Sequence, residues 1–278
     1  MSKAAKKVLD EARESGNPEI ELQDKQIAKI EDLPGLLTME HITRLTLSHN
    51  RLSSLPPAIA HLTNLEILNL YNNHLVELPV AISSLNKLRI LNVGMNRLDT
   101  LPRGFGSFPV LEVLDFSYNN ISEETLPGNF FMLESLRALY MADNDFEILS
   151  PEIKNFKNLQ ILVLRDNDLV DLPREVGELH RLRELHLQSN RLQVLPPEIS
   201  YLDLQGSKSC FRIDGNHLIQ MLADQLLLGI SHVIDIMKTP TYKLLVFTYE
   251  RHQKSNSQYP PKNLEAKDRK ISRVKSQL

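Results

Sequence analysis

The side chains that most often carry out catalysis or bind metals are scattered through this chain. Its single cysteine, Cys210, has no His–Asp grouping nearby that could activate a thiol nucleophile. The nine histidines occur singly, so they form none of the Cys/His pairs that zinc sites require. The adjacent carboxylates Glu123 and Glu124 fall on an expected loop, and no glycine-rich phosphate loop is present. We therefore expect no enzymatic activity, no metal and no cofactor.

A second group of residues, aromatic and polar, recurs at a regular spacing and indicates recognition instead of catalysis. Protein interfaces concentrate aromatic side chains in a centre that is surrounded by polar and charged groups. Tyrosine also favours strands for structural reasons, so composition alone leaves a purely structural role open. We predict a partner-binding site formed by Tyr71, Asn92, Met95, Asp115, Tyr118, Tyr140, Asp143, Arg165, Asp166 and His186.

A repeated phrase of leucines and asparagine positions these residues. Residues Ile42–Pro56 read ITRLTLSHNRLSSLP, and Leu65–Pro79 read LEILNLYNNHLVELP. A repeat of this length predicts a leucine-rich repeat solenoid of the α/β class, with a curved parallel sheet on its concave side and short helices or turns on its convex side. Seven copies place asparagines 23 residues apart, or 25 in one gap, at Asn50, Asn73, Asn96, Asn119, Asn144, Asn167 and Asn190.

The alternation of side chains along a strand determines which residues of each copy face outward. Successive side chains point to opposite faces, so Leu68 and Leu70 are expected in the core while Asn69 and Tyr71 point outward. Eight or nine such strands, about 4.8 Å apart, make a concave sheet on the order of 40 Å long. This sheet is large enough for a standard protein–protein interface.

The remaining positions of each copy have expected structural roles. The amide of each repeated asparagine is predicted to satisfy backbone groups of the turn after the strand. The second half of each copy reads LPxxIxxLxxL, and the three-residue spacing of Ile59 and Leu62 predicts a short helical segment on the convex side. The stretch Ile121–Leu133 holds the two extra residues, and we interpret it as a longer convex bulge in preference to a binding loop.

Composition excludes several classes of protein. The formal net charge of -3 predicts no general attraction to nucleic acid, and one cysteine cannot form an internal disulfide. The first residues are charged throughout and lack the apolar segment of a signal peptide. No apolar stretch is long enough to cross a membrane. We expect a soluble, intracellular monomer.

The two ends of a solenoid must be covered, and the sequence predicts a cap at each end. Residues 1–38 contain an expected helix over Lys3–Ser15, with Val8 and Leu9 facing inward, and a degenerate repeat in which Lys25 replaces the asparagine. Residues 39–205 hold the seven regular repeats.

The C-terminal part is predicted to be an irregular repeat, a helical cap and a tail. In residues 206–251, Phe211, Ile213 and Asn216 fit an eighth strand, and Ile219–Met237 and Thr241–Arg251 have helical spacing. These helices are interpreted as a cap, with a separate partner-binding helix pair as the alternative. Residues 252–278 are poor in apolar residues and weakly basic, which predicts a disordered tail. Contact with anionic lipid and a nuclear-import signal are the alternatives for the tail.

Several runs resemble a known family, and one of them, LPGNFF, is not required by the repeat rule. They are GMNRLDTLPRGFGSF at Gly94–Phe108, LPGNFF at Leu126–Phe131 and ALYMADNDFEIL at Ala138–Leu149. Together with Glu40–Asn50 they resemble intracellular, Ras-linked leucine-rich repeat proteins with 23-residue repeats, and within that class the Ras suppressor family. The resemblance covers residues 1 to about 250. Asn216 is followed by His217 where this family leads one to expect proline, which affects the expected cap.

This resemblance implies a non-catalytic adaptor at integrin adhesions, with a cytoplasmic location. Members of the family bind the C-terminal LIM domain of the adaptor PINCH, and through it join integrin-linked kinase and parvin. They also modulate Ras signalling. The alternatives are a regulator that binds Ras-type GTPases directly and a targeting subunit for a phosphatase or ligase.

Overall fold

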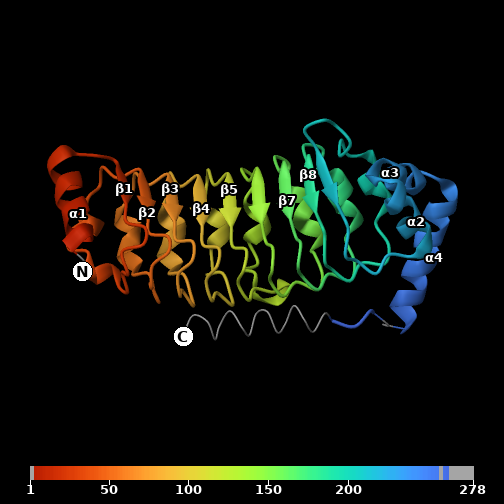
Figure 1. The fold of residues 1–278 in the computed structure, drawn as a ribbon, viewed down its shortest axis with the longest axis horizontal. Coiled ribbons are helices and arrows are strands. Elements are labelled where there is room, and N and C mark those ends of the chain that lie inside the picture. The colour runs from red at the N-terminus through yellow and green to blue at the C-terminus, as the bar shows by residue number, and fades with distance from the viewer. Residues whose placement is uncertain (1–2, 257–258, 263–278) are drawn as a thin grey trace.

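The chain forms an elongated solenoid whose repeats stack in one direction (Figure 1). The structure is a computed structural model that describes residues 3–256 and 259–262. In this part of the chain, nine short parallel strands form one sheet, and their order in space is their order in sequence. This arrangement confirms the predicted leucine-rich repeat fold. The strands are β1 Glu19–Glu21, β2 Arg44–Thr46, β3 Ile67–Asn69, β4 Ile90–Asn92, β5 Val113–Asp115, β6 Ala138–Tyr140, β7 Ile161–Val163, β8 Glu184–His186 and β9 Cys210–Arg212.

Short 3₁₀ helices form the convex side, as the second half of each copy predicts. Ile59 and Leu62 of one copy are both fully buried, which explains their three-residue spacing. Proline stands at the first position of η3, where a missing N–H has no effect on helical hydrogen bonds. The segments are η1 Ile30–Asp32, η2 Leu36–Thr38, η3 Pro57–His61, η4 Val80–Ser84, η5 Phe105–Ser107, η6 Glu123–Thr125, η7 Phe130–Met132, η8 Pro151–Asn155, η9 Arg174–Glu178 and η10 Pro197–Tyr201.

The repeated asparagines form a buried ladder, here called the asparagine ladder, which joins each repeat to the one before it. Asn96 is representative: its Nδ2 donates to the carbonyl oxygens of Val93 at 2.9 Å, of Gly94 at 3.1 Å and of Leu70 in the preceding repeat at 3.1 Å. Its Oδ1 accepts a hydrogen bond from the N–H of Leu75 at 3.0 Å. The predicted structural role of these asparagines is therefore confirmed.

The residue before each ladder asparagine adopts a left-handed backbone conformation. Met95 has φ 54° and Tyr118 has φ 60°, and the equivalent position of the last repeat is the glycine Gly215 with φ 73°. A non-glycine residue in this conformation costs roughly 1–2 kcal/mol. The ladder hydrogen bonds hold the turn closed against this cost, so the turn side chains keep a fixed direction.

The two extra residues are accommodated in an ordered convex bulge. In η6 the side chains of Ser122 and Thr125 form a capping box, and in η7 the ring of Phe130 packs edge-on against Phe116 at 6.3 Å between centroids. The backbone of Asn129 passes so close to Gly106 that a Cβ there would lie 1.7 Å from the Asn129 carbonyl oxygen. The bulge thus packs on the neighbouring repeat.

A helix covers the N-terminal end of the solenoid. Helix α1 spans Lys3–Ser15, as predicted. Leu9, Ala5 and Ala12 are buried, whereas Val8 is only half-buried. Val8 still packs against the core, so the inward stripe contains both predicted residues and also the two alanines.

Three helices cover the C-terminal end: α2 Gln220–Leu228, α3 Ile230–Met237 and α4 Pro240–Asn256. The single helical segment predicted over Ile219–Met237 is wrong, because Gly229 has φ 128° and separates α2 from α3. The cap is anchored by Tyr242, whose buried hydroxyl donates to the Leu195 carbonyl at 2.8 Å and accepts from the Leu195 N–H at 2.9 Å. Burial raises the pKa of Tyr242.

The chain after the cap was predicted to be disordered from residue 252. Helix α4 instead continues to Asn256, so the helix is five residues longer than the predicted end at Arg251. Residues Tyr259–Lys262 are also described, and Pro260 is buried. Residues 263–278 of the predicted tail lie outside the described residues. Among the described helices, none has the length and apolar character needed to span a lipid bilayer.

Candidate partner-binding site

The ten predicted site residues lie on β4–β8 or in the turns that follow β3–β7, facing away from the 3₁₀ helices. We call this set the concave patch. Nine of the ten are half-buried, and Asp143 is 8% exposed. The half-buried members keep one part of the side chain packed and another part accessible, as side chains in a pre-formed interface do.

Two members of the concave patch also shape the backbone, which the sequence analysis missed. The Oδ1 of Asn92 accepts a hydrogen bond from the N–H of Gly94 at 2.9 Å, and that of Asp115 accepts from Ser117 at 2.9 Å. Asn69 makes the same contact with Tyr71 at 3.0 Å. Short polar side chains that cap a backbone N–H two residues later are typical of Asx turns. The sequence signal for these turns was the presence of Asn or Asp at the same position of three successive repeats.

Gly94 marks the centre of the concave patch, although it is not among the predicted residues. A Cβ at this position would lie 3.2 Å from Tyr71 Cδ2, 3.2 Å from Asn92 Oδ1 and 3.3 Å from Asp115 Oδ1. The tyrosine ring and the two polar side chains therefore converge on a residue with no side chain of its own. The sequence signal for this convergence was a glycine at an outward position, where the neighbouring repeats carry Tyr71 and Ser117.

The centre of the concave patch has unbalanced negative charge. Burial raises the pKa of Asp115, and the hydrogen bonds from Ser117 oppose this shift. Burial also raises the pKa of Tyr140, and the nearby charges of Glu184 and Asp115 add to the effect. Asp115 forms no ion pair with any residue in the described part of the chain. A cation placed beside this carboxylate would lower its pKa again.

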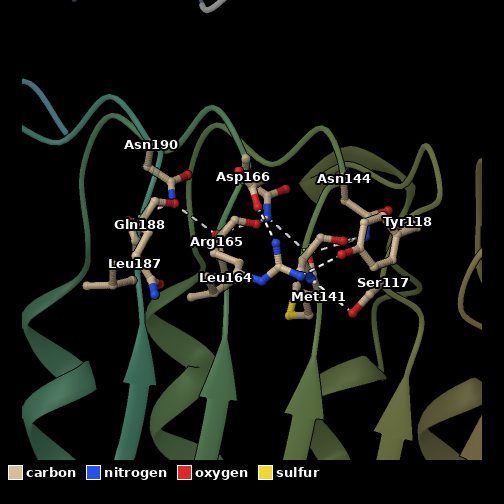
Figure 2. A network of polar contacts seen from close by, with 12 residues as sticks. Ser117, Tyr118, Met141, Asn144, Leu164, Arg165, Asp166, Leu187, Gln188 and Asn190 are labelled. Carbon is tan, nitrogen blue, oxygen red and sulfur yellow. Dashed lines mark hydrogen bonds and ion pairs between the residues drawn. The ribbon is translucent and has the colours of Figure 1, made fainter. Parts of the chain in front are cut away.

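Arg165, in contrast, is already paired within the protein (Figure 2). Its Nη2 donates to the Tyr118 hydroxyl at 2.6 Å, its Nη1 forms an ion pair with Asp166, and its guanidinium lies 5.6 Å from the Tyr118 ring centre. Burial alone lowers the pKa of Arg165, but the contacts with Tyr118 and Asp166 raise it overall. This cluster holds Tyr118 and Arg165 in one fixed arrangement across two repeats.

Two further residues extend the concave patch toward the N-terminus and were not predicted. The ring of His49 packs edge-on against Tyr71, with 5.5 Å between ring centres. The Nδ2 of Asn72 lies 2.8 Å from His49 Nδ1, within hydrogen-bonding distance. At the other end, His186 Nε2 lies 3.5 Å from a Glu184 carboxylate oxygen. The predicted residues thus belong to one continuous surface that begins earlier, at His49.

The geometry is suited to recognition and lacks a metal cage. In the described part of the chain, no three or more His, Cys, Asp or Glu side chains gather where they could hold a metal ion. What the concave patch offers is aromatic rings, amides and one uncompensated carboxylate on a rigid sheet. Such groups bind a partner by packing, hydrogen bonding and charge.

Comparisons with known proteins agree with this description. Models of leucine-rich repeats match residues 40–98 and a leucine-rich repeat region matches residues 99–205. Ras suppressor protein 1 of Homo sapiens is 63% identical over 273 residues, which is 98% of this chain and 97% of that protein. The Bos taurus protein of the same name is 62% identical over the same shares.

Solved structures with the same fold are more distant. A leucine-rich repeat protein of Leptospira interrogans has a TM-score of 0.58 and 26% identity over 77% of this chain, and the chain covers 64% of that structure, less than two thirds. The leucine-rich repeat domain of the type III effector XopL has a TM-score of 0.58 at 23% identity, over 78% of this chain and 82% of that one. The second likeness concerns the fold alone.

Proposed function

Because this chain belongs to the Ras suppressor protein family of leucine-rich repeat proteins, with a role in protein interaction, we propose that it is a non-catalytic adaptor whose concave patch binds a folded protein domain. The observation that carries the proposal is the centre of the patch, where Tyr71 and Asp115 converge on Gly94. Tyrosine is enriched among hot-spot residues, and the half-buried carboxylate next to it is available to a charged group of a partner.

The partner that the family resemblance favours is the C-terminal LIM domain of PINCH. Binding it would connect this chain to integrin-linked kinase and parvin at adhesion sites in the cytoplasm. The charge of the concave face indicates which surface of a partner would fit. Acidic residues (Glu19, Glu21, Asp24, Asp115, Asp143, Asp166, Glu184, Asp214) outnumber basic ones (Arg44, Arg165, Arg212) at outward positions. We therefore expect the partner to present lysine or arginine side chains.

The experiment is a binding titration with the purified C-terminal LIM domain of PINCH. The double variant Asp115→Arg, Tyr140→Ala should bind at least about a hundredfold more weakly, because it removes one hot-spot side chain and reverses another. Thermal unfolding should change little, since both side chains are half-buried. The control variant Glu178→Arg, Tyr201→Ala likewise changes one acidic residue and one tyrosine, but on the convex side, and should bind normally. Full binding by the concave variant contradicts the proposal.

A direct interaction with Ras-type GTPases is the second candidate, because the similar proteins are named for the suppression of Ras. It predicts an affinity that depends on whether the GTPase carries GTP or GDP. Titration of the purified GTPase in both nucleotide states measures this. Equal or absent binding in the two states excludes this candidate and leaves the adaptor proposal standing.

A further inference from the structure

A second set of polar contacts lies on the edge of the solenoid where the chain turns after each strand. We call this surface the turn edge, formed by Asp145–Glu147, Asp168–Val170 and Arg191–Gln193, which follow three successive ladder asparagines. Arg191 is only 7% exposed although it carries a charge. Burying a guanidinium is unfavourable unless it finds hydrogen-bond or charge partners.

Arg191 has one partner in the segment Tyr259–Lys262 and another within the turn edge. Its Nε donates to the Pro260 carbonyl oxygen at 2.7 Å, and its Nη2 donates to the same oxygen. Its Nη1 lies 3.6 Å from a carboxylate oxygen of Glu147, two repeats earlier. Figure 1 shows this short blue segment near the lower edge of the solenoid, beyond the end of α4. This hydrogen bond thus joins two residues that are 69 positions apart in sequence.

The same segment places a cation against the acidic part of the turn edge. The Lys262 ammonium forms an ion pair with Glu147. The hydrogen bond with Glu147 raises the pKa of Lys262, burial opposes this, and the charges of Glu147 and Asp168 add to the rise. Glu147 therefore contacts two cations, Arg191 and Lys262, and connects the solenoid to the segment.

The sequence of the segment suits this surface. It reads Tyr-Pro-Pro-Lys, and Pro260 is buried against the turn edge. Prolines lack a backbone N–H, so Pro260 can be buried without leaving a backbone donor unpaired. Their fixed φ also reduces the entropy that an extended peptide loses on binding. The buried guanidinium of Arg191 donates to the Pro260 carbonyl oxygen, and the carboxylate of Glu147 pairs with Lys262.

We propose that the turn edge is a peptide-binding site for an extended proline-rich segment with a basic residue directly after its prolines. Its occupant is the chain's own Tyr259–Lys262. In this arrangement the segment fastens the chain that follows α4 to three regular repeats. The site is separate from the concave patch and does not depend on the function proposed for that patch. The ion pairs are partly exposed, so docking weakens with added salt.

The absence of tryptophan from the chain allows a direct test. The substitution Tyr259→Trp introduces one tryptophan at a side chain that is 45% exposed, and its fluorescence anisotropy reports docking in the full-length protein. We expect anisotropy well above that of the free peptide Trp-Pro-Pro-Lys. Adding Glu147→Gln or Lys262→Gln should lower the ratio of docked to released segment roughly two- to fivefold. An excess of acetylated Tyr-Pro-Pro-Lys peptide should lower it as well.

The control variant is Glu178→Gln, which removes a comparable carboxylate that lies 3.8 Å from Lys157. It should leave the anisotropy unchanged. Glu147 and Lys262 are partly exposed, so these variants are expected to fold, and circular dichroism checks this. The proposal is overturned if the Tyr259→Trp protein, with no further substitution, already shows the anisotropy of the free peptide. It is also overturned if neither substitution nor the competing peptide changes the signal.

Discussion

Asp115 and Asn119 lie four residues apart in one repeat, yet their polar groups are used in opposite ways. Asn119 is 3% exposed, and its amide bonds three backbone carbonyls and one N–H. Asp115 is half-buried and uses one carboxylate oxygen to cap the N–H of Ser117. The ladder residue has its hydrogen bonds satisfied within the fold, whereas the concave residue keeps capacity for another molecule. This difference separates residues that stabilise from residues that recognise.

The largest effect is expected from the asparagine ladder. Replacing Asn119 with Leu leaves the N–H of Leu98 and several carbonyls buried without their partner, which should lower the free energy of unfolding by roughly 1–3 kcal/mol. Urea unfolding measures the loss. Asn92→Leu is the matched concave variant and should cost less, because Asn92 caps a single N–H. Equal losses for the two variants would remove the distinction between ladder and patch.

Two glycines extend the comparison to steric packing. Gly106→Ala should destabilise the protein by about 1–3 kcal/mol, because its Cβ meets the Asn129 backbone at 1.7 Å. Gly94→Ala meets only side-chain atoms at 3.2 Å or more, so the cost should stay below about 1 kcal/mol. Thermal unfolding of both variants tests this. A larger loss at Gly94 than at Gly106 contradicts the distinction between a glycine covered by side chains, Gly94, and one pressed against backbone, Gly106.

Two tyrosine hydroxyls, one in the C-terminal cap and one in the concave patch, allow a third comparison. Tyr242→Phe removes a buried hydroxyl that bonds both the N–H and the carbonyl of Leu195, and about 1–2 kcal/mol of stability should be lost. Tyr140→Phe in the concave patch should change stability by less than about 0.5 kcal/mol. Chemical denaturation of the two variants beside the parent checks the prediction. Similar losses would mean that Tyr140 is as structural as Tyr242.

The smallest effect is a pH dependence at Asp115. Because burial raises the pKa of this carboxyl above its ordinary value of 3.8, the folded protein binds the proton more tightly than the unfolded chain does. Its charge therefore lowers stability above the raised pKa, and this penalty disappears as pH falls below 3.8. Asp115→Asn should be slightly more stable than the parent at pH 7 and equal to it near pH 3. A variant that is less stable at both pH values contradicts the sign.

The sequence predicted the parts of this molecule that the repeat dictates. The spacing of leucine and asparagine predicted the fold, the asparagine ladder and the positions that face outward. It could do so because each repeat contacts only its neighbours. The break at Gly229 was missed because helical spacing continues across it. The contact of Arg191 with Pro260 was missed because no periodic pattern links residues so far apart. At the concave patch, the sequence identified outward residues but not the convergence on Gly94, which depends on ring placement.

The measurement that tests the central claim most directly is amide hydrogen exchange of the full chain, alone and bound to the C-terminal LIM domain of PINCH. The account predicts slower exchange on binding in β3–β7 and the turns that follow them, centred on Gly94. Protection limited to the 3₁₀ helices or to α2–α4, with exchange in β3–β7 unchanged, would contradict it.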